Sequence, residues 1–175
     1  MTELAVILAI AFSSQFDASD AGIGGRLGWQ ALPLVVLEAE LVHYPGHFAD
    51  DPAFSRARFE GLFGATVGPR LGRVRPFVRL RPGFLRVQEA PEPFACIAIF
   101  PPPLACELAS GRTLTAIDVG GGVDVSVGER TFLRIDAGDR LLKYPGPVFD
   151  SDRNVHEEAF FGHDVRIAAS GGIRF

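Results

Sequence analysis

The sequence predicts an all-β protein, an eight-stranded antiparallel up-and-down transmembrane β-barrel. Three observations predict this fold. Eight segments alternate apolar with small or polar residues at a period of two, the connections between them alternate between short and long, and one face of the second, third, sixth and eighth segments carries no Asp, Glu, Lys or Arg. The chain has 175 residues, which suits a single domain over residues 1–175.

Composition excludes several other classes. Hydrophobic residues make up 47% and charged residues 22% of the chain, with a net charge of -4, so neither disorder nor a basic nucleic-acid-binding surface is favoured. The longest uncharged apolar run, Leu4 to Phe12, is far shorter than the roughly 20 residues that a membrane-spanning helix needs. All basic residues are arginines except Lys143, and this bias needs a physical reason.

Each of the eight segments is long enough to cross a bilayer when tilted. They cover residues 3–13, 21–29, 34–43, 56–67, 75–87, 113–126, 131–143 and 163–175. The large apolar residues of one face are Leu4, Val6, Leu8 and Ile10 in the first, Ile23, Leu27 and Trp29 in the second, Val35, Leu37 and Leu41 in the third, Ile117, Val119, Val123 and Val125 in the sixth, and Val165, Ile167 and Ile173 in the eighth. In the fourth, fifth and seventh, alternate positions carry charge.

The connections give the topology. Short ones fall near residues 30–33, 68–74 and 127–130, and longer ones cover 14–20, 44–55, 88–112 and 145–162. An up-and-down meander puts all short turns at one rim and all long loops at the other. Both termini then lie at the short-turn rim, where the first strand can pair with the last.

The second face of the segments carries many charges of both signs. They are Arg26, Glu38, Glu40, Arg58, Glu60, Arg79, Arg81, Asp118, Asp124, Arg134, Asp136, Asp164, Arg166 and Arg174. An eight-stranded barrel is filled by its own side chains, so we expect these ions to pair in a closed, non-conducting lumen. Arginine suits this role because its planar fork binds carboxylates bidentately. The alternative is a sheet whose polar face is solvated.

The last segment alternates up to a C-terminal phenylalanine, Phe175. With residues 79–85 and 118–124, this segment resembles the small eight-stranded outer-membrane β-barrels of Gram-negative bacteria, the OmpA-like transmembrane domains. The resemblance covers essentially the whole chain. It implies a bacterial outer-membrane location with extracellular long loops and periplasmic termini. It also implies a monomer in contact with outer-membrane lipid, inserted by the barrel-assembly machinery through the strand that ends at Phe175.

Such a protein is made with a secretory signal, yet Glu3 precedes the apolar run and no basic region stands before it. We expect residues 3–13 to form the first strand and the signal to lie outside this sequence. The alternatives are that Leu4 to Phe12 is itself the apolar region of a signal, or that the barrel is designed.

Two cysteines, Cys96 and Cys106, share the longest connection. In the oxidising periplasm or at the cell surface, an even number of cysteines in one loop predicts a disulfide, and two free thiols are the alternative. Their spacing does not suggest zinc, and no metal or cofactor is predicted.

Two strand ends share the sequence Tyr-Pro-Gly, at Tyr44 and Tyr144. We expect both tyrosines at the membrane interface, with Trp29 and Phe175 in the opposite, periplasmic girdle of aromatic residues.

The four histidines, His43, His47, His156 and His163, fall at strand ends or in long loops. No serine with a base and an orienting carboxylate can be assigned by spacing, so surface histidines and no enzymatic activity are expected. The expected role is structural, or one of adhesion or ligand contact by the loops. The alternatives are a lipid-modifying enzyme of the eight-stranded type and a soluble lipocalin-like carrier.

Overall fold

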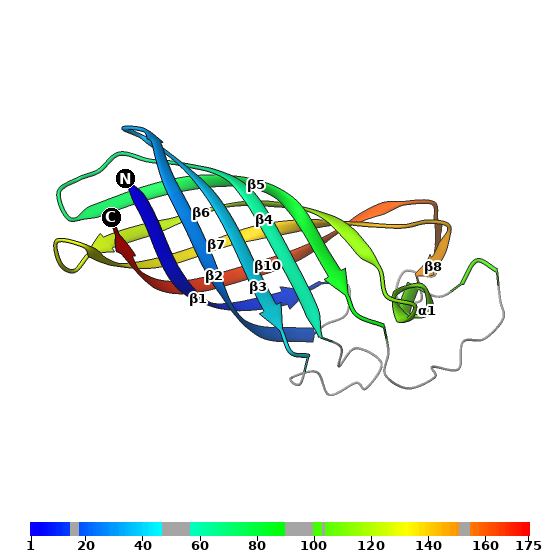
Figure 1. The fold of residues 1–175 in the computed structure, drawn as a ribbon. Coiled ribbons are helices and arrows are strands. Elements are labelled where there is room, and N and C mark those ends of the chain that lie inside the picture. The colour runs from blue at the N-terminus through cyan, green and yellow to red at the C-terminus, as the bar shows by residue number, and fades with distance from the viewer. Residues whose placement is uncertain (15–17, 47–56, 90–99, 103, 151–154) are drawn as a thin grey trace.

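A computed structural model describes residues 1–14, 18–46, 57–89, 100–102, 104–150 and 155–175. Eight antiparallel strands form a closed barrel, with a short helix and a two-stranded hairpin at one end (Figure 1). The barrel strands are β1 (Thr2–Ser13), β2 (Ala18–Leu32), β3 (Val35–Tyr44), β4 (Arg58–Val67), β5 (Val74–Val87), β6 (Thr113–Ser126), β7 (Thr131–Tyr144) and β10 (Phe160–Arg174). The helix is α1 (Leu104–Ala109), and the hairpin is β8 (Val148–Asp150) with β9 (Val155–Glu157).

The barrel closes between its first and last strands. β1 pairs with β10 from Glu3 opposite Arg174 to Ser13 opposite Asp164. At the end of this seam, the Thr2 amide donates to the Phe175 carbonyl at 3.2 Å and the Phe175 amide donates to the Thr2 carbonyl at 2.9 Å. All other neighbours in the barrel are consecutive barrel strands, so the predicted up-and-down topology is confirmed.

The two ends of the barrel differ. Both termini and the three short turns lie at one end, whereas α1 and β8 lie at the other (Figure 1). We call these the short-turn end and the long-loop end. In the turn between β4 and β5, Gly72 has a φ of 64°, a left-handed conformation that favours glycine.

The strands lie close to the predicted segments. β6 begins and ends at the predicted residues, while β10 begins three residues earlier than expected, at Phe160. The helix α1 and the β8–β9 hairpin were not predicted, because six and three residues are too few to show a helical or strand period.

The outward face of the barrel is apolar. Leu8, Val78 and Ile135 are 61%, 65% and 68% exposed, and each lies next to inward residues that are buried. The charged or titratable outward residues of the eight barrel strands are Arg86, Asp139 and Lys143 with His43 and His163, all of them toward the long-loop end. The outer face of the barrel strands is therefore continuously uncharged between these residues and the short-turn end, and we call this region the outer band.

Candidate functional site: the charged interior of the barrel

The interior of the barrel holds charged side chains of both signs in equal number among the described residues. Nine carboxylates face inward: Glu3, Asp20, Glu38, Glu40, Glu60, Asp118, Asp124, Asp136 and Asp164. Nine arginines do so as well: Arg26, Arg58, Arg75, Arg79, Arg81, Arg134, Arg140, Arg166 and Arg174. All are buried except Arg58, whose side chain is 16% exposed. The interior is thus electrically balanced.

The fourteen residues assigned to the lumen from the sequence all belong to this set, but Arg26 forms no ion pair among the described residues, so its predicted place in the ion-pair network is wrong. Sequence reasoning missed Glu3, Asp20, Arg75 and Arg140, which are also buried. Asp20, Arg75 and Arg140 each lie an even number of residues from a predicted lumen residue of the same strand, so strand alternation would have assigned them to the same face. Strand β1 holds no predicted lumen residue, but Glu3 stands next to the outward Leu4, so alternation assigns Glu3 to the interior as well.

A continuous series of ion pairs begins at the short-turn end. Arg174 Nε lies 2.7 Å from Glu3 Oε1, and Arg174 Nη2 lies 4.0 Å from Asp124 Oδ2. Asp124 also pairs with Arg134. Arg134 Nη1 in turn lies 2.6 Å from Glu38 Oε1.

The series continues through the middle of the barrel to the long-loop end. Arg81 Nη1 lies 4.0 Å from Glu38 Oε2 and 2.7 Å from Glu40 Oε2. Glu40 pairs with Arg166 through its other oxygen, and Arg166 Nε lies 3.3 Å from Glu60 Oε1. Arg140 then joins Glu60 to Asp164, with Arg140 Nη2 at 2.6 Å from Asp164 Oδ2.

A branch of the network depends on two glycines. Asp118 accepts from Arg79 Nε at 2.7 Å and from Arg81 Nη2 at 2.8 Å, and Arg79 also pairs with Asp136. Gly120 and Gly138 lie opposite each other in the β6–β7 ladder. A Cβ at Gly138 would lie 3.1 Å from Arg79 Nη2 and 2.6 Å from the Val119 carbonyl oxygen, so glycine leaves room for this guanidinium.

Aromatic rings line the arginines. The guanidinium carbon of Arg134 lies 4.4 Å from the centroid of the Phe77 ring, and that of Arg174 lies 4.4 Å from the Phe132 centroid. Lysine offers neither the planar stacking nor the bidentate pairing that these sites use. Lys143, the one lysine, is exposed on the outside of the barrel.

The expectation that Tyr44 and Tyr144 lie at the membrane interface is wrong. Both side chains face inward and are 1% and 2% exposed. Tyr44 is on the same face as Glu40 and accepts a hydrogen bond from Arg166 Nε at 3.3 Å. Tyr144 stacks on Phe160 with a centroid separation of 5.1 Å. In both strands the alternation that assigned the charges inward also assigns the tyrosine inward.

An apolar cluster closes the long-loop end. Leu104 and Leu108, one turn apart in α1, are buried against inward residues of the barrel strands and of β8. The other members of this cluster are Leu62, Leu85, Leu114, Ala116, Leu142, Tyr144, Val148 and Phe160. The helix therefore packs against the inner wall of the barrel mouth, beyond the ion pairs.

The remaining predicted residues lie at the rims. Trp29 and Phe175 are 56% and 68% exposed at the short-turn end, so their outward placement fits the expected girdle. Cys96 is outside the described residues, and the Cys96–Cys106 disulfide stays a prediction. Cys106 lies in α1, and the described part of the chain contains no free cysteine.

The histidines do not form a catalytic set in the described structure. His163 Nδ1 lies 2.7 Å from Asp139 Oδ2 on the outer face, but the neighbouring Ser14 hydroxyl donates to the main-chain carbonyl of His163. His43 is exposed, whereas His47 and the side chain of His156 are outside the described residues. Within the same residues, no three His, Cys, Asp or Glu side chains group as metal ligands. No described helix is long and apolar enough to cross a bilayer.

No protein-family model and no curated protein matches the sequence. Several solved structures are similar to it, among them the following three. Neisserial surface protein A (NspA) is 15% identical, with 99% of this chain and 96% of that chain covered and a TM-score of 0.57. The outer membrane protein OprG from Pseudomonas aeruginosa is 9% identical, with 99% and 95% covered and a TM-score of 0.53. Ail, the attachment invasion locus protein of Yersinia pestis, is 10% identical, with 99% and 96% covered and a TM-score of 0.50.

These likenesses define the class of fold. The chain has the fold of the small eight-stranded outer-membrane β-barrels, over nearly its whole length and that of the structures compared. The expected resemblance is confirmed at the level of the fold.

Proposed function

We propose that this protein is an integral barrel of a bacterial outer membrane whose lumen does not conduct and whose work is structural or done by its surface loops. The observation that carries the proposal is the division between the two faces of the same strands. The outward residues of the central band are uncharged and exposed, while the charged residues at this level of the same strands face inward and are buried, and all of them except Arg26 form ion pairs among the described residues.

Lipid is the solvent that this division fits. A soluble lipocalin-like carrier would place its apolar face inside and its charges in water, which is the reverse arrangement. Large apolar patches are unfavourable in water but are required on the lipid face of a membrane barrel.

The interior supports a non-conducting barrel. Successive ion pairs connect Glu3 to Asp164, and no N···O distance in this series exceeds 4.0 Å. The apolar cluster that contains Leu104 and Leu108 of α1 lies between these ion pairs and the long-loop end. An ion crossing the lumen would have to separate these pairs, and removing one partner from a buried pair costs several kcal/mol.

Orientation and assembly complete the proposal. Long loops on the cell surface and termini in the periplasm follow the usual arrangement of such barrels. The barrel-assembly machinery would recognise the final strand, which pairs with β1 and ends at Phe175. No nucleic-acid partner is proposed, because the net charge is -4 and the described outward positions of the barrel strands carry one arginine and one lysine only, and a monomer is the proposed state.

The proposal is tested by refolding the full chain into lipid vesicles. Electrophoresis without heating should show a compact band that shifts on boiling, because closed barrels resist SDS. Planar-bilayer recording of the same protein should show no stable ohmic current. A folded, monodisperse protein in detergent-free buffer would contradict the membrane assignment, and a large steady conductance would contradict the closed lumen.

A further inference from the structure

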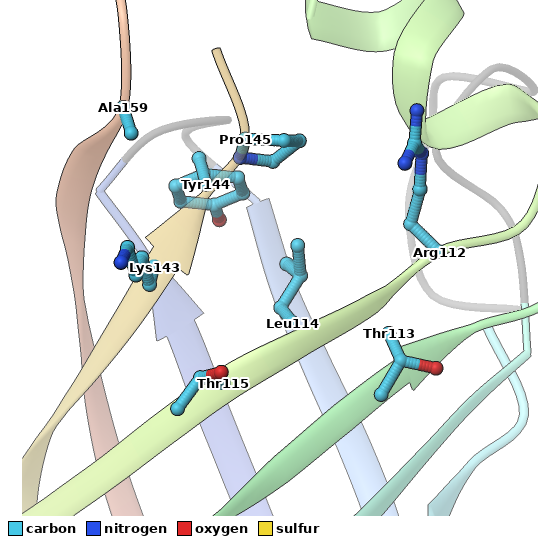
Figure 2. Close-up of a pocket in the computed structure, with 8 residues that line it drawn as sticks. All are labelled: Arg112, Thr113, Leu114, Thr115, Lys143, Tyr144, Pro145 and Ala159. Carbon is cyan, nitrogen blue, oxygen red and sulfur yellow. The ribbon is translucent and has the colours of Figure 1, made fainter.

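A small pocket opens at the long-loop end of the barrel wall, where β6 and β7 separate (Figure 2). The β6–β7 ladder ends at the Thr115–Lys143 pair, and β7 ends one residue later, before Pro145. Proline has no amide hydrogen to continue a ladder. The pocket has a volume of about 160 Å³ and is lined by Arg112, Thr113, Leu114, Thr115, Lys143, Tyr144, Pro145 and Ala159.

The outer side of this pocket carries cations and hydroxyl groups. Lys143 and Thr115 are exposed and directly opposite each other on neighbouring strands, so their side chains lie side by side on the outer face. Arg86 and Thr113 are likewise opposite on β5 and β6, and Arg86 Nη1 donates to Thr113 Oγ1 at 3.3 Å.

The part of the chain that the structure describes supplies no carboxylate partner to the two cations of this cluster, Lys143 and Arg86. Arg112, at the edge of the pocket, pairs with Glu107 of α1. Asp139, an outward carboxylate of β7, pairs with His163, and the exposed Glu89 and Glu158 of the adjacent connections form no ion pair with Arg86 or Lys143. Two unpaired cations therefore flank two hydroxyl groups.

Apolar surface lies immediately below the cluster on the same three strands. Phe84 precedes Arg86 on the outward face of β5, Ile117 follows Thr115 on β6, and Leu141 precedes Lys143 on β7. Among the described outward positions of the barrel strands, Arg86 and Lys143 are the only arginine and lysine. The two cations thus lie together on β5 and β7, on the long-loop side of the apolar outer band.

We propose that Arg86, Thr113, Thr115 and Lys143 form a binding site for the phosphate group of an anionic membrane lipid. Ammonium, guanidinium and hydroxyl groups are the side-chain donors that bind phosphate oxygens. The acyl chains of the lipid lie on the apolar band formed by Phe84, Ile117 and Leu141. Because the surface joins donors to an apolar band, it fits an amphiphile better than a free anion. This inference rests on the proposed membrane location.

The site is tested with the full chain in micelles of a neutral detergent, by native mass spectrometry. The probes are phosphatidic acid, diacylglycerol with the same acyl chains, and inorganic phosphate as competitor. Wild-type protein should retain phosphatidic acid in preference to diacylglycerol. Arg86→Gln with Lys143→Gln should weaken this retention about 30-fold, since each interfacial cation contributes about fivefold.

The matched control removes two exposed arginines from the opposite end, Arg73→Gln with Arg130→Gln, and should leave retention unchanged. Equal weakening in the control, or equal retention of diacylglycerol, would overturn the inference. Displacement of the lipid by an equimolar amount of inorganic phosphate would overturn its lipid identity in favour of a free anion. Heat-modifiable migration of both variants checks folding, so a failure of the lipid site is distinguished from a failure of the membrane assignment.

Discussion

Arg81 on β5 reaches over one strand to Glu40 on β3, with Arg81 Nη1 at 2.7 Å from Glu40 Oε2. The strand between them, β4, contributes neither partner, so this pair passes over the inner face of β4 beside Gly64. Glu40 also pairs with Arg166 of β10. One carboxylate therefore joins three parts of the barrel that hydrogen-bonded strand pairing leaves apart.

This arrangement predicts that a single charge removal is worse than a paired one. Glu40→Ala should lower the free energy of unfolding by about 3 to 5 kcal/mol, because it removes a carboxylate from two buried arginines and leaves an excess of positive charge in the interior. Each arginine keeps another carboxylate, Asp118 at 2.8 Å from Arg81 and Glu60 at 3.3 Å from Arg166, so the remaining contact is longer for Arg166. Glu40→Ala with Arg166→Ala should thus cost less than the sum of its two single changes, by about 1 to 3 kcal/mol.

Denaturant titration of the vesicle-folded barrel measures these free energies. The matched control combines Glu40→Ala with Arg174→Ala, which contacts Glu3 and Asp124 and has no contact with Glu40. The control pair should be additive to within about 0.5 kcal/mol. Strict additivity in the Glu40–Arg166 pair as well would mean that the network carries no coupling energy.

The outer band predicts a depth-dependent cost of charge. Ile167 is 46% exposed, lies near the middle of β10 and has Ile10 and Ala137 as its cross-strand neighbours. Ile167→Arg should destabilise the folded barrel by about 2 to 4 kcal/mol, because the guanidinium would enter the hydrocarbon midplane.

The control for this substitution is Leu71→Arg, in the turn between β4 and β5, where the residue is 63% exposed. Its cost should be about 0 to 1 kcal/mol, as expected near an interface. The same denaturant titration compares the two variants. Equal, small costs at both positions would place the band of Ile167 in water and remove the basis of the membrane assignment.

The apolar cluster predicts that α1 can be detached without opening the barrel. Leu104→Ser with Leu108→Ser removes both helix side chains from the cluster, so α1 should be released while the hydrogen-bonded ladders stay intact. The expected results are faster proteolysis between β5 and β6, an unchanged heat-modifiable band and no ionic current, since the charged network lies below the cluster. Ser110→Ala, at an exposed position, is the control and should behave as wild type. A steady current in the double variant would show that the helix, and not the ion pairs, closes the lumen.

Strand alternation explains why so much of this fold could be predicted from the sequence. Arg134 and Asp136 assign the even positions of β7 to the interior, and the same count includes Arg140 and Tyr144. The Tyr-Pro-Gly motif suggests a turn at the membrane interface, and this interpretation of Tyr144 is wrong because strand alternation places its side chain inside. Arg140 follows from the same alternation but is absent from the predicted lumen set.

Other features could not be predicted from the sequence. The partners of Glu40 come from β5 and β10, and the side-chain reach that selects Arg81 and Arg166 among nine arginines depends on the curvature of the closed barrel. The helix α1 has only six residues, too few to show a helical period in the sequence. The structure shows that its two leucines pack together against inward residues of the barrel strands.

Trp29 allows the depth of the short-turn end to be measured directly. It is the only tryptophan of the chain, is 56% exposed on the outer face, and lies opposite Thr2 and Leu37 on the neighbouring strands. Tryptophan rings prefer the level of the lipid head groups in such barrels. In vesicles, lipids brominated close to the head group should quench its fluorescence more strongly than lipids brominated at the chain end.

The comparison variant, Trp29→Phe with Phe132→Trp, moves the indole to an inward position that is 1% exposed, where the Arg174 guanidinium can stack on it. Brominated lipid should quench this interior reporter weakly, because the barrel wall separates it from the acyl chains. Equal quenching of both reporters would contradict the assignment of the two faces, and quenching of Trp29 by aqueous iodide alone would place the short-turn rim outside the membrane.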